Sequence, residues 1–367
     1  MRAALIPLLL PLATAAQTLT PTLLTPLDPI LNETSGLLNV SGEVWTNLDS
    51  GNGNVLYRID PTTGAVMREV VLGNANNVDW EEVTTDGTWV YMGDFGNNGG
   101  DRTNLRVYRF PLDTLLNLGS DTVLVDTIRF SYADQFDFTP AYEANNWDCE
   151  AFIALSDSLF LFTKNWIDGR TFLYVLPATP GDHLAVRIDS LDAQGLVTAA
   201  TLDAASGDLA LLGYTNGFFV PFVWALTDYS GHHFFNGIAE RHALTIPFVQ
   251  TEGVVWSGAG SLLISNEQSP FSAARLWELE LPMTVGTVVG APTTVRLFPV
   301  PATSYAIVSG ASAKSRLRIM DIRGAVVRDT QLAADGLIPL NAMPNGHYFL
   351  EVTSAPFLHR MPLIIAR

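Results

Sequence analysis

Short runs of alternating apolar and polar residues, separated by Gly, Asn and Asp, recur along most of the chain. In the clearest example, a strand-like run (81–85), the tight turn Asp86-Gly87 and a second run (88–93) are followed by a polar loop and a third run (105–110). An alternation of period two that is bounded by turn residues is typical of β-strands joined in hairpins. This segment therefore predicts a three-stranded antiparallel unit.

The same order of a run, a hairpin, a loop and another run returns four more times. Two copies are clear, at 148–177 and 251–281, and two are weaker, at 35–60 and 197–226. The repeats start near residues 35, 81, 150, 198 and 252, so each step is 46 to 69 residues long. Repeats of this length, built from short strands without helical periodicity, are typical of the blades of a β-propeller. A two-sheet sandwich also has many short strands, but it lacks a repeated three-strand unit.

We therefore expect an all-β protein whose main body, residues 17–290, is a β-propeller of five or six blades. Five units are visible, and the 69-residue step between residues 81 and 150 leaves room for a sixth blade. Residues 291–367 contain further strand runs joined by Gly, Pro and Asn turns, and they predict a small separate β-sandwich domain.

The N-terminus has the layout of an export signal. Residues 1–16 begin with one basic residue, Arg2, continue with an apolar run and end in small residues. This is the pattern of a cleaved secretory signal peptide, and the run is too short for the roughly 20 residues of a membrane-spanning helix. Because no later stretch is longer and equally apolar, we expect an exported protein without a transmembrane segment. With Cys149 as the only cysteine, its stability must come from an apolar core, and 48% of the residues are hydrophobic.

Charge divides the chain at the same place as the strand pattern. Residues 293–367 carry eight Lys or Arg and four Asp or Glu, a net charge of +4. The rest of the chain, without Arg2, has 11 basic and 33 acidic residues, a net charge of −22. Such a surface repels nucleic acids and anionic membranes and suits cations or neutral partners. We therefore exclude nucleic acid as a partner.

Acidic residues gather at one end of the predicted strands. In a propeller, the first strand of each blade lines the central channel and the second strand returns to the same face. Glu81, Glu150 and Glu252 begin the first strand of three blades, and counting from the turn Asp86-Gly87 pairs Glu81 with Met92. The polar residues expected beside these glutamates, at the ends of other strands, are Asn47, Asp49, Asp94, Lys164, Tyr214 and Glu267. All of them are predicted to lie at one mouth of the channel.

Three interpretations of this cluster stay open. Carboxylate oxygens are the ligands that Ca²⁺ prefers, and they point to Glu81, Asp94, Glu150 and Glu252 as a calcium site that supports ligand binding. Paired carboxylates beside Lys164 also suit general acid–base catalysis. In the third interpretation, the polar groups only hydrogen-bond the ends of the inner strands and make the propeller rigid.

Three motifs of the C-terminal domain carry a family resemblance: FPVPA (298–302), IMDIRG (319–324) and MPNGHY (343–348). In this order they resemble the C-terminal sorting domain of proteins exported by the bacterial type IX secretion system. Val300 stands where the family usually has Asn, and His359-Arg360 where it usually has a lysine-rich strand. The resemblance implies contact with the type IX secretion machinery, transport across the outer membrane, removal of the tail, and release or attachment at the cell surface.

The body is also similar to a family of secreted bacterial propellers without an established activity. The segments that carry the similarity are ETSGL (33–37), DWEEV (79–83), GDFGNN (93–98), FSYADQFDF (130–138), DCEA (148–151), LFTKNW (161–166) and TEGV (251–254).

The resemblances imply a secreted or cell-surface protein, and from the acidic mouth we expect it to bind an extracellular ligand there, with calcium. Esterase-like and phytase-like propellers share the Glu-containing inner strand. The first alternative is therefore a calcium-assisted ester or phosphoester hydrolase that uses Glu81, Glu150, Glu252 and Lys164 as catalytic residues. A structural or adhesion protein is the second alternative.

Overall fold

The computed structural model describes most of the chain. The described residues are 18–116, 120–246, 248–282, 296–311, 315–321, 325–333, 336–341, 343–354 and 357–366. The chain divides into two compact units, Met1–Pro282 and Met283–Arg367. The predicted signal peptide (1–16) and the predicted domain boundary near residue 290 lie outside the described residues.

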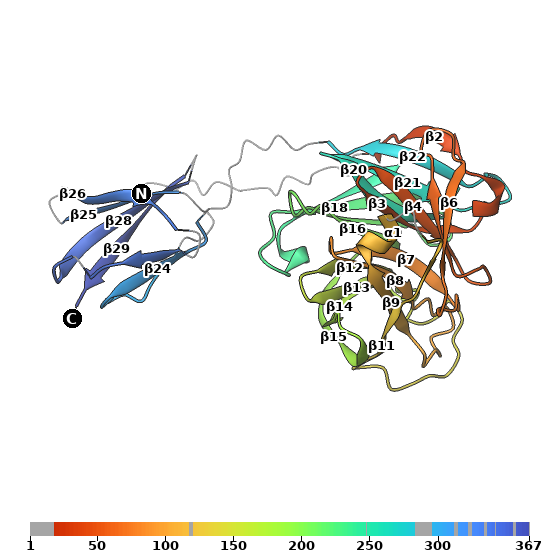
Figure 1. Cartoon of the computed structure of the whole chain (residues 1–367), viewed down its shortest axis with the longest axis horizontal. Coiled ribbons are helices and arrows are strands. Elements are labelled where there is room, and N and C mark those ends of the chain that lie inside the picture. Colours follow the sequence, from red (N-terminus) through yellow and green to blue (C-terminus); the bar gives the residue numbers. More distant parts are fainter. Residues whose placement is uncertain are drawn as a thin grey trace, which may run out of the picture. The chain divides into compact units, whose positions relative to one another are not determined.

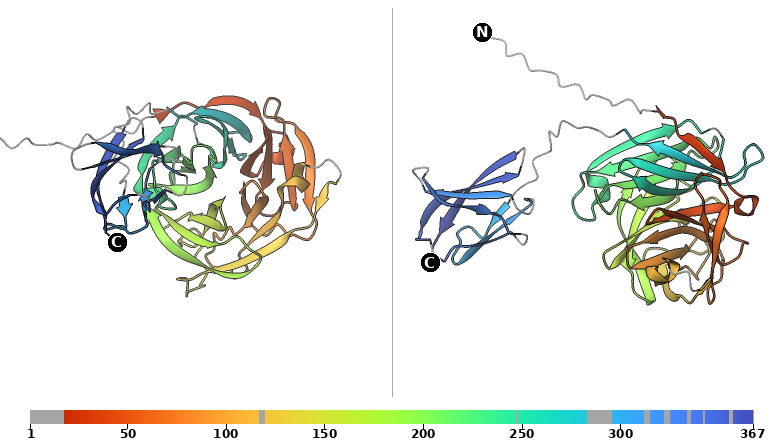
Figure 2. Two further views of the ribbon diagram at one scale, coloured as in Figure 1. Left: turned by 60° about the vertical axis from the view of Figure 1, so that its left-hand side comes forward. Right: turned by 45° about the horizontal axis from the view of Figure 1, so that its top comes forward.

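The first unit is a β-propeller of five blades (Figure 1, Figure 2). From the channel outward, blade 1 consists of β3 (Thr34–Val40), β4 (Glu43–Leu48), β5 (Val55–Ile59) and β6 (Val66–Leu72), and blade 2 of β7 (Trp80–Thr85), β8 (Trp89–Asp94), β9 (Arg106–Pro111) and β11 (Asp126–Tyr132). Blade 3 consists of β12 (Cys149–Leu155), β13 (Ser158–Thr163), β14 (Thr171–Pro177) and β15 (Gly181–Leu191), and blade 4 of β16 (Leu196–Leu202), β17 (Leu209–Tyr214), β18 (Pro221–Thr227) and β19 (Ile238–Leu244). Blade 5 consists of β20 (Thr251–Gly258), β21 (Ser261–Asn266), β22 (Arg275–Glu280) and β2 (Thr22–Pro26). The inner strands β3, β7, β12, β16 and β20 pack in this order, and β20 packs against β3 to close the ring.

The strand β2, from the start of the described chain, completes the last blade. It pairs antiparallel with β22, with Thr22 opposite Glu278. The short strand β1 (Thr18–Leu19) pairs parallel with β19 of blade 4. The two ends of the propeller are therefore held in one sheet, and opening the ring would break that sheet.

The described residues of the long step between the second and third repeats form no further blade. It holds the helix α1 (Leu112–Leu116), the strand β10 (Thr122–Val123) and β11. Strand β10 adds in parallel to β6 of blade 1, while β11 completes blade 2 and also pairs in parallel with β15 of blade 3. The sequence predicted five or six blades. The described residues form five, so the prediction of a sixth blade is wrong.

Apolar side chains fill the spaces between the blades. Trp45 of blade 1 and Trp80 of blade 2 are fully buried in one cluster with Val83 and Met92. Cys149, the only cysteine, is buried as a free thiol. This extensive apolar burial is the main source of stability in a chain without an internal disulfide.

Every inner strand has a β-bulge near its first residue, and the predicted register did not include it. The register shifts lie between Thr34 and Leu37, Trp80 and Val83, Cys149 and Ala151, Val197 and Ala199, and Thr251 and Gly253. A bulge leaves one or more residues unpaired and redirects their side chains. Because the turn spans residues 86–89 and is wider than predicted, Met92 lies opposite Val83, and not opposite Glu81 as predicted, and the bulge leaves Glu81 and Glu82 unpaired.

The second unit is a β-sandwich. One sheet contains β23 (Arg296–Phe298), β24 (Tyr305–Ser309) and β27 (Leu337–Pro339), and the other contains β26 (Val326–Gln331), β25 (Arg316–Asp321), β28 (Gly346–Ser354) and β29 (Phe357–Ile365). Val308 and Ile338 of the first sheet pack in one cluster with Ile319 and Leu350 of the second. The prediction of an all-β propeller followed by a small sandwich is confirmed. No helix among the described residues is long and apolar enough to span a bilayer.

Candidate functional site

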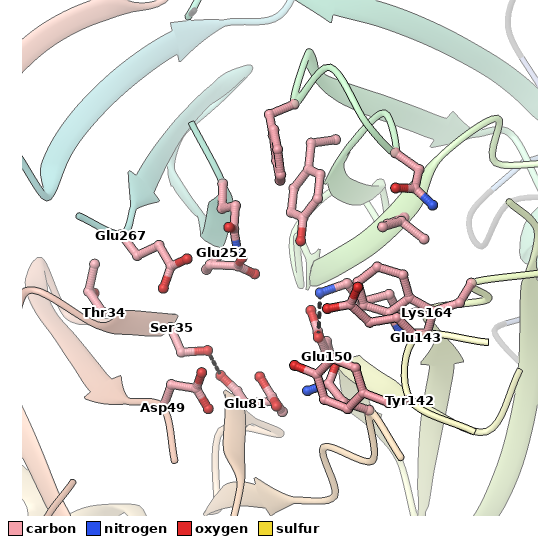
Figure 3. A pocket seen from close by; sticks show the side chains of 17 residues that line it. Thr34, Ser35, Asp49, Glu81, Tyr142, Glu143, Glu150, Lys164, Glu252 and Glu267 are labelled. Carbon is pink, nitrogen blue, oxygen red and sulfur yellow. Dashed lines mark hydrogen bonds and ion pairs between the residues drawn. The ribbon is translucent and has the colours of Figure 1, made fainter. Parts of the chain in front are cut away.

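A cavity opens at one mouth of the channel, where the inner strands begin (Figure 3). Its volume is about 320 Å³. Four blades line it with a residue from the bulge of the inner strand, namely Ser35, Glu81, Glu150 and Glu252, and blade 4 contributes Leu196. The cavity is therefore built from equivalent positions of the repeat.

The bulges decide what these side chains contact. In two blades the bulge carries a hydroxyl, which bonds to a neighbouring blade: Ser35 Oγ donates to the carbonyl oxygen of Glu81 (2.6 Å), and Thr198 Oγ1 to that of Thr251 (2.5 Å). In the other three blades the bulge carries a glutamate that lines the cavity. One backbone feature thus both joins blades and presents carboxylates.

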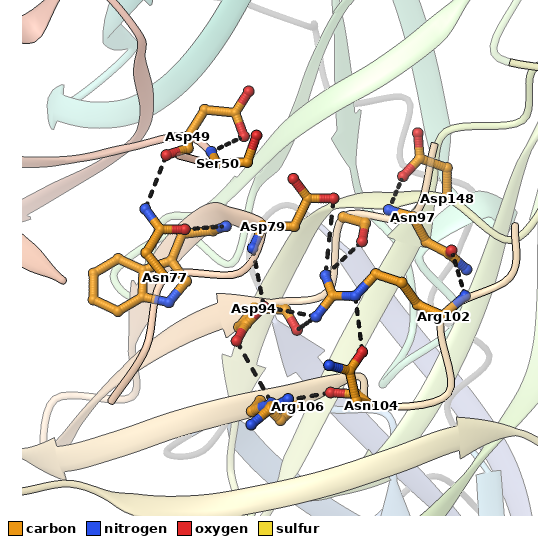
Figure 4. Close-up of polar contacts among 12 residues, drawn as sticks. Asp49, Ser50, Asn77, Asp79, Asp94, Asn97, Arg102, Asn104, Arg106 and Asp148 are labelled. Carbon is orange, nitrogen blue, oxygen red and sulfur yellow. Dashed lines mark hydrogen bonds and ion pairs between the residues drawn. The ribbon is translucent and has the colours of Figure 1, made fainter. Parts of the chain in front are cut away.

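Three carboxylates form a group suited to hold a metal ion. One oxygen each of Asp49, Asp79 and Glu81 lies within 4.8 Å of the others. Backbone contacts fix two of these residues (Figure 4): the N–H of Asp79 donates to Asp94 Oδ1 (3.2 Å), and Asn77 Nδ2 donates to the carbonyl oxygen of Asp49 (2.8 Å). Oxygen ligands of this kind are those that Ca²⁺ prefers.

These carboxylates are crowded and largely shielded from water. Burial, followed by the charge of Asp49, raises the pKa of Asp79 to about 7, although Arg102, 3.8 Å away, acts to lower it. Burial also raises the pKa of Glu81 well above its usual value, and the charges of Asp49 and Glu150 add to the effect. Glu81 is 5% exposed, and within the described part of the chain its carboxylate receives no hydrogen bond. A bound cation would stabilise the ionised form of both acids.

Lys164 supplies positive charge on the opposite side of the cavity (Figure 3). Its Nζ lies 2.5 Å from Glu150 Oε1, 4.9 Å from the ring centroid of Trp166 and 5.3 Å from that of Tyr214. Burial acts to lower the pKa of Lys164, but the neighbouring acids, Glu150 first, outweigh it and raise that pKa. The ammonium therefore stays charged, held by one carboxylate and two aromatic rings.

Blade 5 adds two further acids. Glu252 is 8% exposed, and its Oε1 accepts a hydrogen bond from the amide of Gln250 (3.4 Å). Burial raises the pKa of Glu252 to about 7, and burial together with the charge of Glu252 raises that of Glu267 to about 8. Six carboxyl groups and one ammonium line the cavity, so acids outnumber bases there.

The structure brings together seven of the nine site residues predicted from the sequence. These are Asp49, Glu81, Glu150, Lys164, Tyr214, Glu252 and Glu267. Asn47 and Asp94 are fully buried outside the cavity lining. Asn47 donates to the carbonyl oxygen of Glu81 (3.3 Å), whereas Asp94 binds Arg102 (2.8 Å) and Arg106 (3.5 Å). Two guanidinium groups occupy the Asp94 carboxylate, so this residue is not the free metal ligand that the sequence predicted.

Asp79 and Arg102 belong to the site but were not singled out by their place in the repeat. Asp79 completes the group of three carboxylates, and Arg102 Nη1 donates to the carbonyl oxygen of Gly96 (2.6 Å). Gly96 is the available signal, because a Cβ there would lie 2.1 Å from Glu81 Oε1 and 2.6 Å from Asp79 Oδ2. Gly96, which follows the acidic residues of the second repeat, thus marks a place where the backbone closely approaches two carboxylates.

Comparison with solved structures finds matches at low identity. PorZ, a bacterial surface component of the type IX secretion system of Porphyromonas gingivalis, is 13% identical, with 91% of this chain and 45% of PorZ covered and a TM-score of 0.34. A hypothetical protein from Leishmania major is 10% identical, with 74% and 92% covered and a TM-score of 0.40. The Cps50 (Swd1) β-propeller domain of Myceliophteria thermophila is 12% identical, with 71% and 99% covered and a TM-score of 0.36. The chain spans about half the length of PorZ.

The second unit matches a protein family directly. Residues 296–365 match the model of the secretion system C-terminal sorting domain, from the first residue of β23 to the last of β29. None of the curated proteins compared matches the chain. The family match confirms the resemblance seen in the sequence, and with it export to the cell surface or the medium through the type IX secretion machinery. The C-terminal unit is therefore a type IX secretion system C-terminal sorting domain.

Proposed function

We propose that the propeller binds Ca²⁺ through Asp49, Asp79 and Glu81, and that the ion forms part of a binding site for an extracellular ligand. The observation that carries the proposal is the placement of three carboxylate oxygens within 4.8 Å of one another. Ca²⁺ binds oxygens at about 2.3 to 2.6 Å, so oxygens at this mutual spacing fit around one ion. The sorting domain directs the chain to the outside of the cell, where calcium is abundant.

The rest of the cavity suits a small polar molecule. Tyr142 and Trp166 line it together with the amide side chains of Asn98 and Asn216. Aromatic faces with a few well-placed polar groups are typical of small-molecule sites. Three protein carboxylates leave coordination positions of a six- to eight-coordinate ion open to oxygens of the ligand.

The competing candidate is calcium-assisted hydrolysis of a carboxylic or phosphate ester. One observation favours it: the pKa of Glu252, raised by burial to about 7, would let this group exchange a proton near neutral pH. Glu81, Glu150 and Lys164 would be its partners, and calcium would neutralise the charge of the substrate.

Isothermal calorimetry of CaCl₂ into the chelator-treated, full-length mature chain tests the calcium site. We expect binding by the wild type, weakening of at least about tenfold in an Asp79→Asn, Glu81→Gln double variant, and no change in Asp113→Asn, an exposed acid of α1. A wild type that binds no calcium, with the double variant merely less stable, would contradict the proposal and indicate a structural or adhesion protein. Calcium-dependent turnover of p-nitrophenyl acetate or p-nitrophenyl phosphate would favour the hydrolase.

A further inference from the structure

The group of Asp49, Asp79 and Glu81 leaves four of the six acids that line the cavity outside the proposed calcium site, and Lys164 pairs with only one of these four, Glu150. Glu252, in the bulge of β20, and Glu267, directly after β21, line the cavity from blade 5 (Figure 3). In the described part of the chain, the group of close ligand oxygens comprises only the first three residues. The pair on blade 5 therefore needs a separate explanation.

Among the described residues, Glu252 and Glu267 form no ion pair, and the nearby charge of Lys164 compensates them only at a distance. Lys164 is the only basic residue among those that line the cavity, and it is bound to Glu150. Glu252 receives a long amide hydrogen bond from Gln250. The second oxygen of Glu150, a residue only 4% exposed, has no hydrogen-bond partner among the described residues. One Ca²⁺ carries two positive charges, whereas six carboxyl groups line the cavity, so acids remain that the ion does not neutralise.

Phe219 gives the cavity an additional aromatic face. Its φ of +48° lies in the left-handed region, which a phenylalanine rarely adopts. Two hydrogen bonds hold the turn: the N–H of Phe219 donates to the carbonyl oxygen of Thr215 (3.0 Å), and the N–H of Val220 donates to Thr215 Oγ1 (3.1 Å). In this conformation the ring lines the cavity, 5.5 Å from the ring of Tyr214.

Lys164 shows which chemical group such surroundings stabilise. Its ammonium lies in the same cavity between a carboxylate and aromatic rings, of which Trp166 is the nearest. Carboxylates and aromatic faces both attract ammonium groups, and the attraction grows when water is excluded. Glu252, Glu267 and Phe219 line the same cavity and offer the same chemistry, while the ammonium of Lys164 is paired with Glu150.

We propose that the ligand carries an ammonium group that binds beside Glu252 and Glu267, with Phe219 as an aromatic wall, while oxygens of the same molecule face the calcium ion. A cavity of about 320 Å³ admits a molecule the size of the amino end of a short peptide. The ligand class is therefore a small zwitterionic amine. This inference rests on the proposed function, because it takes the same cavity as the ligand site.

Triglycine and N-acetyltriglycine test the inference, since they differ in the ammonium group. Each peptide is titrated by calorimetry into the full-length mature chain at saturating Ca²⁺. We expect triglycine to bind at least about tenfold more tightly, the effect of one charged hydrogen-bonded contact. A Glu252→Gln, Glu267→Gln double variant should lose this preference and still bind calcium, which shows that it is folded. Phe219→Leu should weaken triglycine binding and leave the acetylated peptide unaffected.

Three results would overturn the inference: equal affinities of the two peptides for the wild type, no binding of either, or a preference that survives in the double variant. A clear preference for triglycine in a wild-type chain that binds no calcium would support the ammonium site and contradict the calcium proposal. The two failures are therefore distinguishable.

Discussion

Glu82 is the carboxylate on which we expect the stability of the propeller to depend most. It follows Glu81 in the bulge of β7 and is fully buried. Its Oε2 accepts a hydrogen bond from the N–H of Ala200 in blade 4 (3.1 Å), and its Oε1 accepts one from Val83 (3.0 Å). The N–H of Leu37 in blade 1 is a third donor. Because blades 2 and 4 are not neighbours in the ring, this carboxylate must lie in the channel, where it joins three inner strands.

The substitution Glu82→Leu removes the acceptor of three buried N–H groups. A buried donor without an acceptor costs about 1 to 3 kcal/mol, so the lower limit for three donors is about 3 kcal/mol. We use the lower limit because burial raises the pKa of Glu82, and removing a buried acid is itself favourable. This loss is a large part of the roughly 5 to 15 kcal/mol by which domains are stable. Glu82→Gln keeps one acceptor oxygen, so its loss should be smaller.

Urea denaturation followed by circular dichroism measures these losses. The matched control is Glu69→Ala, which removes an exposed glutamate of the outer strand β6 and should change the free energy of unfolding by less than about 0.5 kcal/mol. A loss below about 1 kcal/mol for Glu82→Leu would refute the reasoning, because it would mean that the three donors find other acceptors or water.

Three further changes test the cavity. Lys164→Met leaves Glu150 buried without its ion-pair partner and should lower the free energy of unfolding by about 3 to 5 kcal/mol. Adding Glu150→Gln should restore part of this loss. A double variant as unstable as Lys164→Met alone would contradict the energetic coupling of the two side chains. Gly96→Ala places a methyl group 2.1 Å from Glu81 Oε1 and should displace this carboxylate. Calorimetry should therefore show a calcium affinity at least about tenfold weaker. An unchanged affinity would argue against Glu81 as a ligand of the ion in this geometry. Because the pKa of Asp79 is raised to about 7, the folded chain holds protons that the unfolded chain releases. In chelator, the Tm of the chain should therefore fall as the pH rises from about 5 to about 8, and in calcium it should fall less. If Tm depends on pH equally with and without calcium, Asp79 does not bind the ion.

The positions of Glu81, Glu150 and Glu252 at one mouth could be predicted from the sequence. The spacing of apolar residues and turns marks the hairpins, and the repeat of the hairpins marks the blades. Since equivalent strands of a propeller begin at the same face, their first residues share one mouth. The glutamates were therefore placed without knowledge of any contact between distant residues.

Features that depend on contacts between distant residues could not be predicted in this way. A bulge inserts residues into a strand without a clear change in its apolar pattern, so the unpaired positions of Glu81 and Glu82 were hidden. The pairing of β2 with β22 joins the two ends of the propeller. Asp94 looked like a metal ligand at a strand end, and only the folded loop shows that Arg102 takes its carboxylate.

A crystal structure of the full-length mature chain grown with CaCl₂, with anomalous differences collected near the calcium signal, tests the central claim most directly. We predict a peak bounded by oxygens of Asp49, Asp79 and Glu81 at about 2.3 to 2.6 Å. A mouth without such a peak at saturating calcium, or a peak held by other residues of the cavity, would contradict the account.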